Sequence, residues 1–529
     1  MKFKSKLVLL PTLLATVASL GACGNKENTD ALKIVYFAGG YAGTWLEESV
    51  VEFLAQEKGV DKSQIKKNVD YVLTPDSTVT NNTRKYLKGD APDILMTQGG
   101  FKSYVKDGLI ANLDSVYSSE VSYTKEDGTQ GKRTVNDSII PEIRDKFKFQ
   151  MKYGRGESSA WALPWGASFE SFAYNEDLLL ATTHASTLPV GEDAVDKTTN
   201  KWVRVPYTTD ELMAYFDDIN ISNQGKSETE KVVPFGWPGR EMIWFDFIFN
   251  TFWAQYQGVN SSNYPGQKSW YDFWNVDRRD NWNQKGLTEA YNKLRSIITD
   301  GNGNYINSEV NESGGNNVSL EELNTRAANQ KYAVWLAGDF FENETLAFTD
   351  KNKDGKPDFS IKMMYIPTAT SGSRQKLAFF NSEEVMFIPQ KSPHIDLAKK
   401  YLTYLCNENE LMRFTKSTGT VRPFTYKPAK LEPTYNWSTW QKSIFEILDD
   451  TETQRLYCNP KNVTVDKVSP VTINEQISGY FPLTAQSFYG QLRTKTGDVV
   501  FSDIFQQTTS KFDTDWNTPT KYADYFANL

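Results

Sequence analysis

The first hundred residues alternate between strand-like and helix-like patterns, and this alternation constrains the fold more than any other feature. The order is a strand over 32–37, a helix ending at Gly59, a strand over 69–73, a helix ending at Leu87 and a strand over 91–96. Strands joined through single helices pair in parallel within one sheet. Ligands of such doubly wound sheets bind beyond the carboxyl ends of the strands, where the glycine-containing loops 39–43 and 97–100 lie.

The segment Trp161–Asn175 is predicted to run between two halves of the protein. Pro164 supplies no N–H to a ladder, so the apolar run around it is expected at a sheet edge or a strand end. From Ser168 to Tyr174 apolar and polar residues alternate, which is typical of a half-buried strand. On the pattern alone, an ordinary core strand explains this segment equally well.

The composition argues against several classes of function. The 529 residues carry a formal net charge of −8, which disfavours nucleic-acid binding through a basic face. No internal apolar run approaches the roughly 18 residues that a membrane-spanning helix needs. The sequence has two histidines and no H-E-x-x-H, G-x-S-x-G or C-x-x-C motif, so no catalytic centre is indicated. Carboxylates are numerous, however, and a glycosidase pair stays open.

The N-terminus has the pattern of a signal peptide over 1–22. Three lysines within the first six residues precede an apolar stretch that is too short to span a membrane. Leu20-Gly21-Ala22-Cys23 follows and resembles the lipobox of bacterial lipoproteins. The resemblance implies cleavage before Cys23, a diacylglyceryl group on its sulfur, and a tether over 23–30 that holds the protein on the outer face of the cell membrane. A plain secretory signal is the alternative.

Two further cysteines, Cys406 and Cys458, would lie outside the cytoplasm, where a disulfide is permitted. Cys406 ends a helical pattern and suits a buried apolar position. We therefore expect two free, inert thiols.

Several segments along the chain follow one another in a characteristic order. They are Leu87–Ile94, Gly108–Leu113, Ala162–Asn175, Pro206–Leu212, Ala333–Asp339, Glu384–Pro389 and Gly419–Pro423. Together they resemble family 1 of the bacterial extracellular solute-binding proteins of ABC importers, the maltose-binding type. The resemblance covers most of the mature chain. Val334 takes the place of a family methionine, and the chain is longer than most members.

The resemblance implies an α/β, two-lobed periplasmic-binding-protein-like fold of type II. Each lobe is expected to be a doubly wound sheet with helices, with the ligand cleft between the lobes. Lobe 1 would comprise 31–173 with 384–428, and lobe 2 would comprise 174–383 with 429–529, so that three crossings form a hinge. The extra length falls in polar inserts that are expected to be surface loops and local elaborations: 117–134, 185–203, 261–285, 301–317 and 427–466.

A sugar cleft combines aromatic rings, which stack on C–H faces, with polar groups that bind hydroxyls. The predicted ligand-binding residues, several of them placed by the family resemblance, are Tyr36, Tyr41, Gln98, Trp165, Ser168, Glu170, Trp237, Arg240, Trp244, Asp339, Phe340 and Tyr480. For each residue, an ordinary core or surface position is the alternative, and we expect about half of the set to touch ligand.

The expected function is that of a binding protein without catalytic activity or cofactor. It would be a monomer that captures a saccharide, with an oligosaccharide favoured, and delivers it to ABC permease subunits in the membrane. Nucleic acid is not an expected partner. A binder of another solute such as a peptide, a surface lipoprotein glycosidase or lyase, and an adhesion protein are the alternatives.

One loop has the front half of a calcium-binding EF-hand pattern. Asp350, Asn352, Asp354 and Asp358 supply oxygen atoms around Gly355, and oxygen is the ligand that Ca²⁺ prefers. The twelfth position, which should hold a bidentate carboxylate, is an isoleucine. A polar turn without metal is therefore the main alternative to a structural calcium site.

Overall fold

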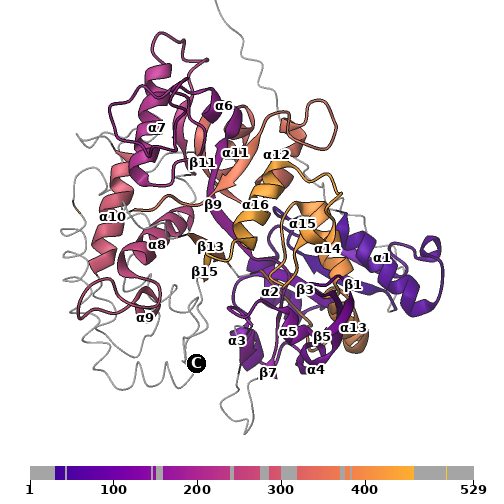
Figure 1. The fold of residues 1–529 in the computed structure, drawn as a ribbon. Coiled ribbons are helices and arrows are strands. Elements are labelled where there is room, and N and C mark those ends of the chain that lie inside the picture. Colours follow the sequence, from indigo (N-terminus) through magenta and orange to yellow (C-terminus); the bar gives the residue numbers. More distant parts are fainter. Residues whose placement is uncertain are drawn as a thin grey trace, which may run out of the picture.

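The computed structural model describes residues 30–457, except 42–43, 145–146, 150–158, 239–242, 274–284, 300–317, 370–375 and 382–383, together with residue 496. Within these residues, two large sheets each carry helices, which gives the two lobes of the fold (Figure 1). Two small two-stranded sheets complete the described strands. None of the described helices is long and apolar enough to cross a membrane.

The first sheet has the strand order β2-β1-β3-β14-β8. Its strands are β1 (Leu32–Tyr36), β2 (Tyr71–Pro75), β3 (Ile94–Gln98), β8 (Leu163–Pro164) and β14 (Glu384–Phe387). β1 pairs in parallel with both β2 and β3, as the alternating pattern predicts. β14 returns from late in the chain and pairs antiparallel with β3 and β8.

The helices of the first lobe follow the apolar pattern of the sequence. They are α1 (Trp45–Lys58), α2 (Val79–Lys88), α3 (Lys102–Lys106), α4 (Asp114–Ser118), α5 (Val135–Ser138), α13 (Ile395–Tyr404) and α14 (Glu408–Thr418), with a short 3₁₀ turn, η1 (Lys62–Gln64). In α1, Leu46, Val50 and Phe53 share one face and are buried. Gly59 ends α1 with a φ of 63°, the left-handed conformation that glycine adopts without steric cost.

The second sheet has the order β10-β11-β9-β13-β15, with β12 also paired to β9. The strands are β9 (Ser168–Asn175), β10 (Val233–Gly236), β11 (Tyr332–Gly338), β12 (Ile361–Met364), β13 (Leu377–Asn381) and β15 (Gln454–Tyr457). β11 pairs along one edge of β9, β12 and β13 pair along the other, and all eight residues of β9 are buried. β9 is therefore a central strand and not the half-buried strand that its alternating pattern indicated.

The helices of the second lobe surround this sheet. They are α6 (Glu176–Ala181), α7 (Thr209–Ser222), α8 (Ile243–Gln257), α9 (Trp270–Phe273), α10 (Lys285–Ile298), α11 (Leu320–Ala328), α12 (Phe341–Thr349) and α16 (Thr439–Asp449). The α8 and α10 helices pack closely on each other and, in Figure 1, lie on the opposite side of β9 from α16.

The chain passes between the two sheets at three places. The first passage is 165–167, since β8 belongs to the first sheet and β9 lies wholly in the second. The boundary between the lobes predicted after residue 173 lies inside β9, so the passage comes several residues earlier. The second passage is between β13 and β14, and the third leads from α14 through residues 419–438 to α16 and β15.

Among the described residues, three of the polar inserts contain regular structure, and the insert 261–285 holds α9. The first forms the hairpin β4 (Glu120–Thr124) and β5 (Gln130–Thr134). The last contains α15 (Pro428–Leu431), α16 and β15, and the buried Trp440 packs its helix into the core. The described part of this insert is therefore a local elaboration that packs on the core and not only a surface loop, because an apolar face on α16 is buried. The remaining short strands, β6 (Lys148–Phe149) and β7 (Ser159–Ala160), pair with each other.

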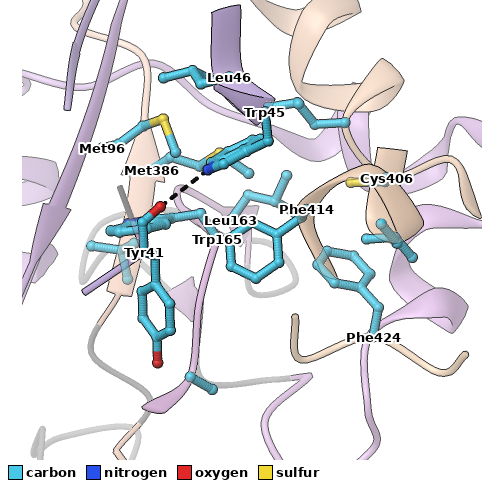
Figure 2. Packing of buried hydrophobic residues seen from close by; sticks show 14 of the residues in the cluster. Tyr41, Trp45, Leu46, Met96, Leu163, Trp165, Met386, Cys406, Phe414 and Phe424 are labelled. Carbon is cyan, nitrogen blue, oxygen red and sulfur yellow. Dashed lines mark hydrogen bonds between the residues drawn. The ribbon is translucent and has the colours of Figure 1, made fainter. Parts of the chain in front are cut away.

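Cys406 is a free, buried thiol next to the core of the first lobe (Figure 2). Its Sγ donates to the Leu402 carbonyl oxygen at 3.3 Å, and burial raises the pKa of the thiol to about 12. The predicted inert thiol is confirmed at this position. Cys458 lies outside the described residues, as does Cys23.

Candidate functional site

The two lobes meet where the loop after β1 faces the end of β11. The Tyr41 hydroxyl, from the first lobe, donates to Asp339 Oδ1 of the second lobe at 3.0 Å. The Thr420 hydroxyl donates to the other carboxylate oxygen of Asp339. All three side chains are buried, so these bonds form a dry polar contact between the lobes. We refer to Tyr41, Asp339 and Thr420 as the junction.

Aromatic rings surround the junction. Tyr41 makes edge-on contacts with Trp165 and Phe340, with ring centroids 5.7 Å apart in each pair. The Trp165 indole donates to the Thr97 carbonyl oxygen at 3.1 Å, which fixes its orientation. Figure 2 shows the Trp45 indole directed at the backbone carbonyl of Tyr41, a hydrogen bond of 3.1 Å.

Three carboxyl groups lie near Tyr41: Glu170 in β9, Glu384 in β14, and Asp339 directly after β11. Burial and the nearby Asp339, Glu384 and Glu170 together raise the pKa of the Tyr41 hydroxyl well above its usual value. Burial also raises the pKa of Asp339 to about 7, although its hydrogen bonds favour the charged form. Glu384 lies opposite Gln98 across β14 and β3, and the two side chains are 3.5 Å apart.

Arg422 connects two of the passages between the sheets. It is 1% exposed, and its guanidinium donates to the carbonyl oxygens of Trp165 (3.2 Å), Pro164 (3.1 Å) and Leu405 (2.5 Å). These hydrogen bonds connect the first passage, at residues 165–167, with the third, at residues 419–438. The sequence did not indicate Thr420 as a junction residue or Arg422 as a link between the passages, because no local pattern reveals which carbonyl or carboxylate a side chain will meet.

Close packing at the junction requires glycine. A Cβ atom on Gly40 would lie 2.5 Å from the Phe340 ring, and one on Gly166 would lie 3.2 Å from the Tyr41 ring. The Gly40 carbonyl also accepts a hydrogen bond of 2.7 Å from Asn343 of the second lobe. Glycine in these loops therefore permits the two lobes to approach closely.

The structure brings most of the predicted ligand-binding residues toward this junction but leaves few of them accessible. Those that keep partial exposure are Tyr36, Gln98 and Phe340. Those that are buried are Tyr41, Trp165, Ser168, Glu170, Trp237 and Asp339. Arg240 and Tyr480 lie outside the described residues. The backbone of Trp244 belongs to α8, but its side chain is not among those that the structure describes.

The EF-hand-like loop is held by its own backbone. The amide N–H groups of Asp354 and Gly355 donate to the Asp350 carboxylate at 3.0 and 2.8 Å, and the N–H of Lys351 donates to Asp358 at 2.9 Å. These contacts are those of a polar turn. Among the described residues, no cluster of three or more histidine, cysteine or acidic side chains is arranged to hold a metal. The choice between a polar turn and a calcium site stays a prediction.

The fold resembles those of two solved structures. A binding protein from Bacillus subtilis subsp. subtilis strain 168, MsmE in an open conformation, is 12% identical, with a TM-score of 0.54 over 93% of this chain and 99% of that one. A structure from work on xylan utilization by the thermophilic bacterium Caldanaerobius polysaccharolyticus is 14% identical, with a TM-score of 0.56 over 90% of this chain and 99% of that one. At these identities the likeness supports the fold.

Sequence comparison gives the family. No curated protein matches the sequence. The profile of the family described as "Bacterial extracellular solute-binding protein" matches residues 29–408, which is most of the chain. The chain therefore belongs to the bacterial extracellular solute-binding protein family.

Proposed function

We propose that this protein captures a saccharide between its lobes and delivers it, unchanged, to the permease of an ABC importer. The open form takes up the sugar, closure about the three passages buries it, and the closed form docks on the permease. The ligand drives closure only to the extent that it binds the closed form more tightly than the open one. The energy for import comes from a separate ATPase.

The observation that carries the proposal is the convergence of accessible aromatic and polar side chains from both lobes. Tyr36 ends β1 and Gln98 ends β3 in the first lobe, and Phe340 follows β11 in the second. The Tyr41–Asp339 hydrogen bond holds these strand ends opposite each other. Rings that stack on C–H faces, beside amide and hydroxyl groups, suit the surface of a sugar.

The similar structures favour the same class of ligand. One comes from work on xylan utilization, which concerns a polysaccharide. A shared fold does not transfer a ligand by itself, so the likeness supports the choice of saccharides as the first compounds to test.

Lipid anchoring at Cys23 is part of the proposal and follows from the lipobox-like sequence. Replacing Cys23 by serine removes the acyl acceptor and should move the protein from the membrane fraction into the medium. Continued membrane association of the Cys23→Ser protein in the absence of the permease would contradict the anchor.

Thermal unfolding of the mature protein with xylo-, cello- and malto-oligosaccharides and with short peptides tests the proposal. A ligand that binds only the native state, at about 100 times its Kd, should add about 2.7 kcal/mol of stability. Gln98→Ala should weaken the response, whereas Gln130→Ala, a matched change at an exposed position of the β4–β5 hairpin, should not. A response to peptides alone would replace the saccharide by a peptide, and new reducing ends would identify a glycosidase.

A further inference from the structure

A cavity lies in the second lobe, beyond the outer edge of β12. It has a volume of about 340 Å³ and is bounded by β12, by residues 205–207, by residues 365–368 and by α16. The Met363 N–H donates to Ser443 Oγ at 2.8 Å, and the Thr439 hydroxyl donates to the Ile361 carbonyl at 3.2 Å, so α16 is fastened to this edge. The volume falls within the range of about 300–1,000 Å³ that small-molecule sites occupy.

This cavity is separate from the junction. Tyr174, which lines the cavity, lies four residues further along β9 than Glu170, which faces Tyr41. At about 3.3 Å per residue, the two positions are about 13 Å apart. A ligand in the cavity therefore occupies a different place from one held between the lobes.

Three tyrosines line the cavity: Tyr174, Tyr207 and Tyr365. Tyr207 is 36% exposed, and the Arg204 guanidinium lies 3.8 Å from its ring centroid. Tyr174 is 7% exposed, and its hydroxyl has no hydrogen-bond partner among the described residues. A hydroxyl that lines a cavity without a protein partner is a group to which a polar ligand can form a hydrogen bond.

The charges around the cavity argue against an anionic ligand. Lys362 is paired with Glu176 at 2.6 Å, and Lys376 is paired with Asp450 at 2.6 Å and Glu452 at 2.9 Å. Both cations are therefore balanced, and the exposed carboxylate of Glu446 adds a negative charge at the rim. The carboxylates outnumber the two ammonium groups, so an anion would be repelled, while the paired ammonium and carboxylate groups can donate to and accept from the hydroxyls of a neutral ligand.

We propose that this cavity is a second saccharide site, which holds a sugar ring against the tyrosines and pairs its hydroxyls with Tyr174 and the rim charges. A neutral polyhydroxyl compound fits the set of three aromatic rings, hydroxyl and ammonium donors and carboxylate acceptors. The site goes beyond the proposed inter-lobe capture, because a ligand here contacts one lobe and needs no closure.

Methionine methyl signals in NMR spectra can test this site directly. Met363 and Met364 line the cavity, whereas Met96 and Met386 lie in the first sheet. The full protein, labelled with ¹³C at its methionine methyl groups, is titrated with xylotetraose, cellotetraose and maltotetraose. The site predicts saturable shifts of the Met363 and Met364 signals, which are assigned by single substitutions with leucine. Titration to about 10 mM sugar detects a Kd in the millimolar range.

Substitutions distinguish the cavity from the junction. Tyr207→Ala should weaken the Met363 and Met364 response about tenfold, which corresponds to about 1.4 kcal/mol. Tyr174→Phe removes only the hydroxyl and should weaken it about fivefold. Tyr435→Ala is the matched control, since Tyr435 is 39% exposed beside Lys416 in a different part of the protein.

The same titration of the Phe340→Ala protein distinguishes binding in the cavity from binding between the lobes. Saturable shifts that persist there, without ligand-driven closure, support the cavity even if inter-lobe capture fails. The proposed site is overturned if no tetrasaccharide moves the two signals, if the shifts disappear with Phe340→Ala, or if Tyr174→Phe, which preserves the ring and the fold, leaves the response unchanged.

Discussion

Replacing Asp339 by asparagine should make the stability of this protein less dependent on pH. The carboxyl group is 1% exposed, and burial raises its pKa from 3.8 to about 7. Below about pH 4 the group is protonated in both the folded and the unfolded state. Between pH 4 and 7 the folded state keeps a proton that the unfolded state releases, so the free energy of unfolding falls as the pH rises. Above pH 7 this contribution is constant.

The magnitude follows from the shift of about three pKa units at 1.36 kcal/mol each, which gives about 4 kcal/mol. Asparagine has no such titration and can still accept the Tyr41 hydroxyl, while the Thr420 hydroxyl can rotate to accept from its amide. The stability of Asp339→Asn relative to the wild type should therefore rise by up to about 4 kcal/mol from pH 4 to pH 8.

Urea unfolding at several pH values, followed by tryptophan fluorescence, measures this difference. Asp354→Asn, in the exposed loop after α12, is the matched control. Glu342 is also buried with its pKa raised to about 7, so the variant should keep part of the pH dependence. A difference between Asp339→Asn and wild type that stays constant from pH 4 to pH 8 would refute the reasoning.

Three further predictions concern the surroundings of the site. Arg422→Met should destabilise the protein by about 3–5 kcal/mol in urea unfolding, because three buried carbonyl oxygens lose their donor; a loss below about 1 kcal/mol would contradict this role. Cys406 should resist alkylation at pH 8 in the native protein and react after denaturation, as measured by peptide mass spectrometry; rapid native modification would contradict its burial. A calcium chelator should leave the thermal midpoint unchanged, since loop amides already occupy Asp350 and Asp358, and a fall in the midpoint would show that the loop holds calcium.

The order of the first strands could be predicted because it depends on local patterns. Periodicity and glycine positions indicate β1, β2 and β3, and right-handed crossover rules then require parallel pairing. The same reasoning located the glycine loop that carries Tyr41, since ligand loops follow the carboxyl ends of such strands.

The burial of β9 and of α16 could not be predicted in the same way. The alternation in Ser168–Asn175 indicates one exposed face, but β9 is a central strand of a sheet that has helices on both sides, and all eight residues are buried. The polar composition around α16 suggested loops, yet a capping box at Ser438 and an apolar face that includes Trp440 form a packed helix. In both cases tertiary contacts override the local pattern.

The sequence indicated which residues lie between the lobes, but it did not indicate what those residues contact there. Tyr41, Trp165 and Asp339 do lie where the lobes meet, but they contact one another and are buried. Their burial depends on partners far away in the sequence: Tyr41 and Asp339 are 298 residues apart, and Asp339 and Thr420 are 81 apart. No local pattern indicates which of these residues will meet.

Small-angle X-ray scattering of the mature protein, with and without an oligosaccharide that raises its thermal midpoint, tests the central claim most directly. Capture between the lobes predicts a smaller radius of gyration in the presence of the sugar, with the sugar recovered intact afterwards. An unchanged radius at saturating sugar, or the appearance of new reducing ends, would contradict capture by lobe closure.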